Sequence, residues 1–424
     1  MTTDSYSYDK IDYDKSFRTP AYPTFIKIMR KISGEESYLK NVIRVQKVAY
    51  FVSVIFFYLA IEKITKKRAI PIIASLLYGC LPSLFCWNLF ILTESFAIVF
   101  TVLIAYLTIS YLVKPNAVFA IAISILSFLA IMLRPAMIFL LPIFLVFWII
   151  KTLVTKEKTI KTKHKYGLIS CILAIALVIG YCFSIQNRFG FFGVSFVSDL
   201  NKTWMMVDSG VYANFPDAEK IKIIESHANF DSYFVLTEKY GHEETMRFVN
   251  ETITQNKRGY AKYLAEKVVH NSDKTIHAIY AAKLFEEIDL ATFSGMMLPI
   301  NFGIVYLVLL VGFIYIFYSL LRYRVIDWMI TFALAFIFSN LFLSIFMAPN
   351  ELQRLFIVSI PLIIVLASYW VSRFVFKVKG FEEQILSRKP DKRLSLLIWT
   401  LDHDEICKVM KKKKTAIKRR RNVK

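Results

Sequence analysis

Several ionisable side chains stand at the ends of long apolar stretches of this sequence. Glu94 lies in "LTESF", Arg134 in "LRPAM", and Glu351 and Arg354 in "NELQRL". Ionisable residues at membrane depth are costly and mark functional sites. Guanidinium forks match phosphate or pyrophosphate groups, and a carboxylate serves as a general base or a metal ligand. The set therefore suits transfer from a lipid-phosphate donor.

The first residues add further candidates. The segment "DSYSYDKIDYDKSFRTPAYP" carries aspartates at positions 4, 9, 12 and 14, followed by Arg18 and Tyr22. One or two of these aspartates would act in chemistry and the rest would be solvated. We expect the segment to lie on the same side of the membrane as the residues named above.

Each of these residues also has a structural interpretation. Glu94 would be favoured at a helix N-terminus by the helix dipole, with Thr93 as the cap. Arg134 before Pro135 would anchor a turn at the lipid head groups. Glu351 and Arg354, three residues apart, would form a surface ion pair.

Composition places these residues in a membrane protein. Hydrophobic residues make up 56% of the 424, against roughly 45–50% in soluble domains, and the mean hydropathy is +0.49. The excess lies in blocks of about 20 residues, the length that crosses a bilayer. The sequence thus predicts an all-α polytopic membrane protein with about nine transmembrane helices and a small helical extracytoplasmic domain.

The apolar blocks define the expected organisation. Residues 1–41 form a first extracytoplasmic loop with an amphipathic juxtamembrane helix at 24–32, and residues 186–295 form a helical loop domain. Residues 42–185 hold six spans, 296–376 hold three, and 377–424 form a basic tail. The nine expected spans are 44–62, 69–90, 93–113, 117–133, 136–154, 166–185, 296–320, 325–347 and 354–376.

The net charge of +21 is distributed unevenly. The connection 151–165 and the tail 377–424 are strongly basic, whereas residues 186–295 carry more acids than bases. Basic connections lie in the cytoplasm, so we expect a cytoplasmic C-terminus and an extracytoplasmic face for residues 1–41 and 186–295. The tail has no aromatic interleaving and no folded module around it, so we expect membrane lipid and no nucleic acid as its partner.

Metal chemistry has little support in the sequence. The five cysteines form no CxxC pair. His270 and His277 are seven positions apart and would share one face of a helix, but exposed or capping histidines are commoner than a metal site. We assign no metal ligands. The cofactor stays unknown, with a divalent metal left open.

Together these motifs resemble the GT-C membrane glycosyltransferases, a group that includes the lipid A aminoarabinose transferase and relatives of protein O-mannosyltransferase. The similarity rests on the acidic loop with "RTPAYP", on "LTESF", on "LRPAMIFLLP", on "NRFGFFGVSF" and on "ELQRLFIVSIPLIIVLA". It covers most of residues 1–376. In the family a hydrophobic helix precedes the acidic loop, so we expect this chain to lack the family's first helix.

The resemblance implies transfer of a sugar from a polyprenyl-phosphate donor to a glycan, lipid or protein acceptor on the extracytoplasmic face. It implies Asp4 as catalytic base, Glu94 as a second catalytic acid, and Arg134 and Arg354 as donor-phosphate ligands. Arg18, Tyr22 and Glu351 would be structural or substrate-orienting. A polysaccharide polymerase or ligase, or a lipid-linked glycan transporter, stays open as an alternative.

Overall fold

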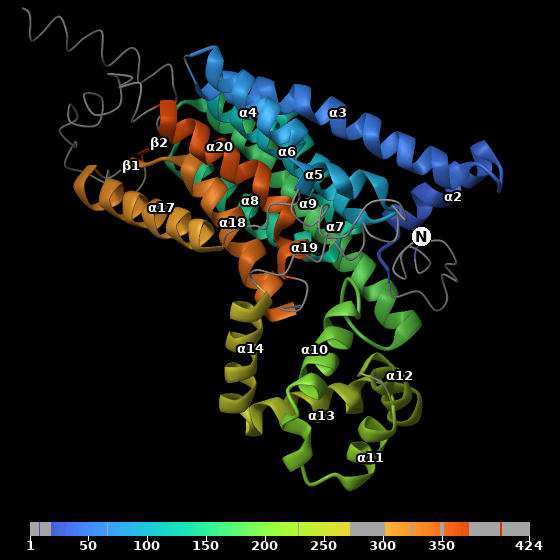
Figure 1. Cartoon of the computed structure of the whole chain (residues 1–424). Helices are drawn as coiled ribbons and strands as arrows, with labels where there is room; N and C mark the ends of the chain where they lie inside the picture. Colours follow the sequence, from blue (N-terminus) through green and yellow to red (C-terminus); the bar gives the residue numbers. More distant parts are fainter. Residues whose placement is uncertain are drawn as a thin grey trace, which may run out of the picture.

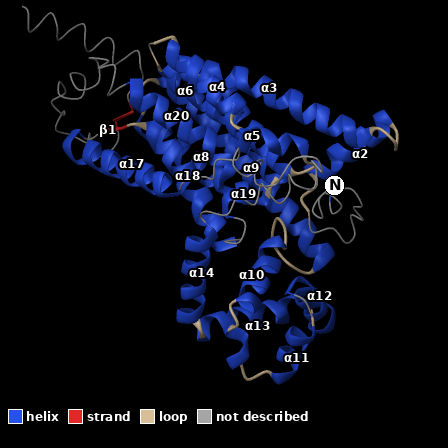
Figure 2. Cartoon of the chain, in the orientation of Figure 1, coloured by secondary structure: helices blue, strands red, loops and turns tan. Residues whose placement is uncertain are grey.

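The computed structural model is a bundle of apolar helices with a smaller helical unit at one end (Figures 1 and 2). It describes residues 8, 18–65, 67–227, 229–271, 302–323, 325–347, 352–372 and 399–400. Among them the only strands are the two-residue β1 and β2, which pair in parallel through Val325 and Trp399. The prediction of an all-α membrane protein is confirmed.

The N-terminal half of the bundle follows the apolar blocks closely. Its helices are α2 (Ala21–Ser33), α3 (Tyr38–Ile64), α4 (Ala69–Cys80), α5 (Pro82–Phe85), η1 (Cys86–Leu89), α6 (Thr93–Val113), α7 (Ala117–Leu133), η2 (Pro135–Phe139), α8 (Leu140–Val154) and α9 (Lys158–Phe189). The predicted amphipathic helix at 24–32 lies within α2. There Phe25 and Met29 pack against the core, while Ile28 and Ile32 are exposed.

The C-terminal half contains the helical unit and the last bundle helices. The unit is built from α10 (Val197–Asp208), η3 (Val211–Asn214), α11 (Ala218–Ser226), α12 (Asn229–Tyr240), α13 (His242–Gln255) and α14 (Lys257–Asn271). The bundle then continues through α17 (Phe302–Tyr323), β1 (Val325–Ile326), α18 (Trp328–Met347), α19 (Leu352–Phe356), η5 (Ile357–Ser359), α20 (Ile360–Trp370) and β2 (Trp399–Thr400).

Seven described helical segments are long and apolar enough to cross a membrane, and the count is eight when a bent pair is taken as one span. The bent pair is α4 with α5 and η1, broken by 54° at Pro82, where a proline removes a helical hydrogen bond. The remaining expected span, 117–133, is α7, which has 17 residues, the lower limit for crossing. It ends at Arg134 because Pro135 disfavours helical geometry in the preceding residue.

Hydrogen bonds show that the bent pair and α7 both run the length of the bundle. Gln46, near the start of α3, donates to the carbonyl of Phe90 at 2.8 Å, so the pair returns to the end where α3 began. The carbonyl of Leu133, at the end of α7, accepts from Thr19 at 3.2 Å. We call this end of the bundle the Glu94 end, and the opposite end the Lys151 end.

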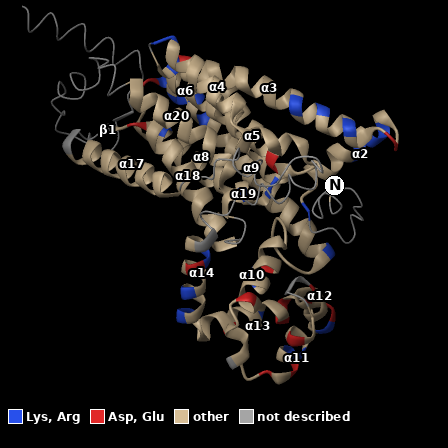
Figure 3. Cartoon of the chain, viewed as in Figure 1, with Lys and Arg blue, Asp and Glu red and all other residues tan. Residues whose placement is uncertain are grey.

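The helical unit contacts the bundle at the Glu94 end. α14 contacts α18 and α19, and α10 contacts α18, and Figure 1 shows the unit projecting from that end. Its own core is formed by Met206, Ile224, Leu236, Phe248 and Val249. Figure 3 shows charged residues throughout this unit and at the bundle ends, whereas the middle of the bundle carries almost none.

Candidate active site

Glu94 lies at the centre of the candidate site. It occupies the first turn of α6, where the helix dipole favours a carboxylate, and only 2% of it is exposed. The helix begins after Leu92, whose backbone is extended and whose side chain makes no cap. Thr93 is therefore not the cap; its hydroxyl lies 3.5 Å from Glu94 Oε2.

Two arginines from distant parts of the chain converge on this carboxylate. Arg354 Nε donates to Glu94 Oε1 at 2.7 Å, and Arg134 Nη2 lies 3.7 Å from the same oxygen. Both arginines are almost fully buried, with 4% and 6% exposed. Arg134 stands at the break between α7 and η2, and Arg354 lies in the short helix α19. Three of the predicted site residues thus meet.

Within the described residues, this site is rich in guanidinium donors. Two guanidinium groups face one carboxylate, and Arg134 Nη1 has no hydrogen-bond partner among the described residues. A buried N–H group without an acceptor is unfavourable. The described part of the chain therefore presents a buried, donor-rich position to which an anion would bind.

A second group of polar residues holds the turn before Glu94. The hydroxyl of Tyr22 donates to Gln46 Oε1 at 2.6 Å, and Gln46 Nε2 donates to the Phe90 carbonyl. Ser95 donates to Asn88 Oδ1 at 2.5 Å, which ties η1 to the first turn of α6. Tyr22 is fully buried, and its predicted structural or substrate-orienting role stays a prediction.

Tyr8 and Arg18 lie at the same end of the bundle. The Arg18 guanidinium stacks over the Tyr8 ring at 4.6 Å, and that ring packs edge-on against Tyr22 at 5.1 Å. The predicted residues Asp4 and Glu351 lie outside the described residues, as do Asp9, Asp12 and Asp14. Their predicted roles stay predictions.

Several residues that organise the site were not singled out from the sequence: Thr19, Gln46, Asn88, Ser95 and Asn340. Asn340 Nδ2 donates to Ser359 Oγ at 2.9 Å, which fixes the segment after Arg354 against α18. A useful signal exists in the sequence, because Gln46, Asn88 and Asn340 are amides within apolar stretches, where polar side chains need internal partners.

No group of three or more His, Cys, Asp or Glu side chains in the described ranges is arranged to hold a metal ion. His270 and His277 cannot be placed as a pair, since residue 277 falls outside those ranges. The described site is thus one of guanidinium groups around a carboxylate.

Residues 17–181 match the family model described as dolichyl-phosphate-mannose-protein mannosyltransferase, a GT-C type family. The match includes Glu94 and Arg134 but not Asp4 or Arg354. Comparisons with curated proteins and with solved structures find no match to the chain. The predicted resemblance to GT-C membrane glycosyltransferases is confirmed over the matched residues.

Proposed function

From the membership of residues 17–181 in this family of GT-C glycosyltransferases, we propose that the enzyme takes a sugar from a polyprenyl-phosphate donor at the Glu94 end of the bundle. The acceptor would be a glycan, a lipid or a protein. One observation carries the assignment of the site: the buried Glu94 carboxylate is shared by two arginines, and Arg134 Nη1 has no acceptor within the described ranges.

Arg134 and Arg354 are proposed to hold the donor phosphate. A phosphate would accept from Arg134 Nη1, which has no partner within the described ranges. Guanidinium groups bind phosphate with two parallel hydrogen bonds and stay charged at every working pH. In the water-poor interior these bonds stabilise charge that develops on the leaving phosphate.

Glu94 is proposed to position the two arginines. Its Oε1 already accepts from Arg354 and faces Arg134, an arrangement that orients both guanidinium groups. The carboxylate then acts through the arginines, which refines its predicted role as a second catalytic acid. Glu94 also lies in the family-matched part of the chain, while Arg354 does not.

The reaction needs a base as well as a phosphate site. The bond from sugar C1 to the phosphate oxygen breaks, a bond from C1 to the acceptor oxygen or nitrogen forms, and the acceptor loses a proton to the base. The phosphate leaves with the bonding electron pair. Asp4 is proposed for the base, with Arg18, Tyr22 and Glu351 as orienting residues.

We place this reaction on the extracytoplasmic face of the cell membrane. The connection 151–165 at the Lys151 end and the tail 377–424 are basic, which favours the cytoplasm for that end. The unit α10–α14 and the arginines would then face the other side. The proposed domain limits are those expected from the sequence, with residues 1–41 and 186–295 outside.

A transfer assay on membranes tests the proposal. Crude membranes that contain the full chain are supplied with polyprenyl-phosphate mannose, and the release of polyprenyl monophosphate is measured. Because the membranes supply the acceptor and the assay measures the leaving group, the acceptor need not be identified. Arg134→Gln and Arg354→Gln are each expected to lower the rate by roughly 10²–10³, the loss typical for one charge-stabilising donor.

The control is Arg44→Gln. Arg44 is an exposed residue of α3, and among the described contacts it donates only to Asn41, at 2.9 Å. The transfer rate of the Arg44→Gln variant should therefore equal that of the wild type. Undiminished release in both site variants would refute the phosphate assignment. Release of a diphosphate from a pyrophosphate-linked glycan would favour the polymerase or ligase, and transport without cleavage would favour the transporter.

A further inference from the structure

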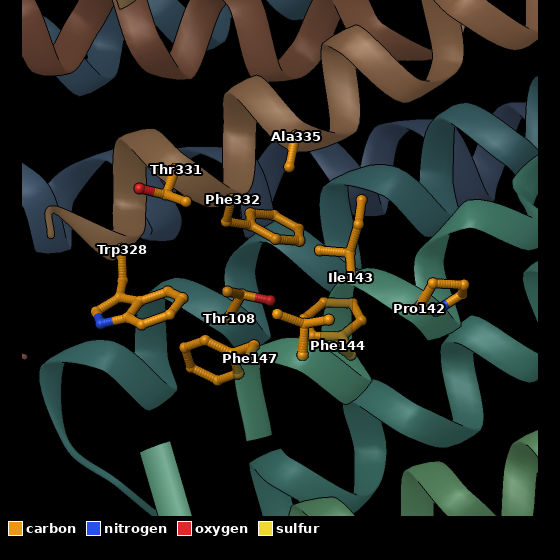
Figure 4. A pocket seen from close by; sticks show the side chains of 10 residues that line it. Thr108, Pro142, Ile143, Phe144, Phe147, Trp328, Thr331, Phe332 and Ala335 are labelled. Carbon is orange, nitrogen blue, oxygen red and sulfur yellow. The ribbon is translucent and has the colours of Figure 1, made fainter. Parts of the chain in front are cut away.

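A cavity of about 310 Å³ lies between α6, α8 and α18, away from the arginines (Figure 4). Its wall is formed mainly by apolar side chains, among them Phe144, Phe147, Trp328, Phe332 and Ala335. The volume is at the lower end of the range for small-molecule sites and exceeds an apolar cavity of about 150 Å³ that takes up benzene. The cavity is thus large enough for an apolar ligand.

The cavity is separate from the proposed active site. Thr108 in its wall follows Glu94 by fourteen positions in the same helix, about 21 Å along the axis. The cavity therefore belongs to the Lys151 end of the bundle. Val146 at its edge is 55% exposed on the surface of a candidate span, so the opening faces lipid.

One hydroxyl inside the cavity has no partner. Thr108 is 2% exposed, and its Oγ1 makes no hydrogen bond within the described part of the chain. Figure 4 shows this oxygen directed into the space between Phe144 and Phe332. The other hydroxyl of the wall, on Thr331, already donates to the Asp327 carbonyl at 2.8 Å, and water needs two to four polar partners to be retained. An apolar chain fits the lining better.

A buried cation stands beside the cavity. Lys151 lies one helical turn after Phe147 in α8 and is 5% exposed. Its Nζ is 5.8 Å from the ring centroids of both Phe147 and Trp328, two residues of the cavity wall. The connection that follows carries five more lysines up to Lys165. An apolar space next to cations is complementary to an anionic amphiphile.

We propose that this cavity binds one acyl chain of an anionic phospholipid, whose phosphate lies near Lys151. Charge complementarity favours this occupant over a zwitterionic lipid, and the opening toward the bilayer gives the chain a path. Anionic lipids concentrate in the cytoplasmic leaflet, the leaflet that the basic connection predicts for this end. The site does not depend on the proposed glycosyltransferase reaction.

Native mass spectrometry of the purified full chain tests the site. The protein is stripped of lipid in detergent and offered phosphatidylglycerol or phosphatidylcholine with the same acyl chains. The wild type should retain one phosphatidylglycerol in preference to phosphatidylcholine. Lys151→Gln should reduce that preference roughly fivefold, the equivalent of about 1 kcal/mol for one basic residue.

A second pair of variants tests the cavity itself. Ala335→Phe fills the space and should abolish retention, whereas Ala176→Phe adds the same bulk to the exposed face of α9 and should not. Thermal unfolding is measured for both variants to verify that they are folded. Equal retention of the two lipids by the wild type, unchanged retention in Ala335→Phe, or displacement of phosphatidylglycerol by equimolar polyprenyl phosphate would each overturn the proposal.

Discussion

Glu94 and Arg354 form a buried pair whose structural and chemical roles can be separated. Arg354→Gln leaves the carboxylate without its 2.7 Å partner. Removing one member of a buried ion pair costs about 3–5 kcal/mol in the free energy of unfolding. The double variant Glu94→Gln/Arg354→Gln removes both charges but leaves the buried Arg134 without its carboxylate, so it should recover only part of that loss. Thermal unfolding in detergent measures it.

Sugar transfer should respond differently from stability. If Arg354 binds the donor phosphate, the double variant stays inactive although part of its stability has returned. If Arg354 served only to neutralise Glu94, the double variant would regain transfer. That result would remove Arg354 from the phosphate site while leaving the family assignment intact.

Tyr22 supports the site through a single hydroxyl. Tyr22→Phe would leave Gln46 Oε1 without the donor that now lies at 2.6 Å, deep in the bundle. An unsatisfied buried acceptor costs about 1–3 kcal/mol. We expect a lower melting temperature and slower transfer, because Gln46 also holds the Phe90 carbonyl close to Glu94.

A matched control for this change is Tyr58→Phe. The Tyr58 hydroxyl reaches only Glu62 at 3.5 Å, on the outside of α3, so its loss should alter neither melting nor transfer. Equal effects of the two substitutions would show that the Tyr22 hydroxyl has no special part in the site.

The ionisable members of the site were predictable from the sequence, and their partners were not. Glu94, Arg134 and Arg354 stand out because charge is rare in apolar stretches. Their convergence depends on tertiary contacts across 260 positions, between α6 and α19, which no local pattern contains. Gln46 and Asn88 are inconspicuous in sequence, because a neutral amide is a weak signal until its partners are known.

At the scale of elements, two glycines of α9 differ in what a side chain would meet. A Cβ at Gly167 would lie 2.7 Å from the indole ring of Trp148, whereas one at Gly180 would meet nothing within 4 Å. Trp148 is fully buried against Tyr111 and Phe147. Gly167→Ala should therefore cost about 1–3 kcal/mol.

Gly180→Ala is the control for this prediction, since it lies in the same helix. There alanine should be neutral or slightly stabilising, because it favours helix over glycine. Thermal unfolding in detergent compares the two alanine variants. In a Trp148→Leu background, which lacks the indole ring, Gly167→Ala should no longer lower the melting temperature. Similar melting of both alanine variants would contradict the close contact of α8 and α9.

Asp208 links the first and last helices of the α10–α14 unit. It accepts from Tyr263 at 2.6 Å and pairs with Lys267 at 2.8 Å. Burial opposes ionisation, but the hydrogen bonds from Lys267 and Tyr263 and the Lys267 charge lower the pKa of Asp208 below its usual 3.8. Its stabilising contribution is therefore complete above that value and is lost as pH falls through the folded-state pKa.

Asp208→Asn should therefore weaken the unit at neutral pH. The difference from the wild type should shrink as the pH is lowered below 3.8. Limited proteolysis across a pH series reports opening of α14. The exposed Asp231 of α12 provides the control, because Asp231→Asn should leave the proteolysis profile unchanged. A pH-independent effect of Asp208→Asn would refute the linkage.

The elements were predicted well wherever apolar periodicity decides them. The block 69–90 is continuous in sequence, yet Pro82 bends it by 54°. The helix α9 begins at Lys158, eight residues before the expected span, because lysine is a good helix former and carries the helix beyond the bilayer. The helical unit was expected only as a helical loop domain at 186–295, whereas the structure shows separate helices there, with α13 and α14 divided at Asn256.

At the scale of the whole molecule, the bundle has two chemically different ends. Glu94, Arg134 and Arg354 gather at one, together with α10–α14, while Lys151 and the lysines that follow it mark the other. Each described span runs from one end of the bundle to the other, and this includes the bent pair and α7. Fixing the side of one end therefore fixes the side of all connections.

Cysteine labelling in intact cells tests the orientation. Lys222 is exposed on α11, and Lys222→Cys in a Cys407→Ser background should react with a membrane-impermeant maleimide. The native Cys407, in the basic tail, should react only after the membrane is permeabilised. The basic connections predict this result, because lysine and arginine near span ends are retained in the cytoplasm.

The opposite labelling pattern would reverse both proposals for the molecule. The arginines would then face the cytoplasm, and the lipid cavity would open into the outer leaflet, where the preference for an anionic phospholipid would lose its physical basis. The expected pattern would instead place Arg134 and Arg354 outside, at the depth where the phosphate of a membrane-embedded donor lies beside the helical unit. The same experiment therefore orients the sugar donor and the phospholipid on opposite faces of one bundle.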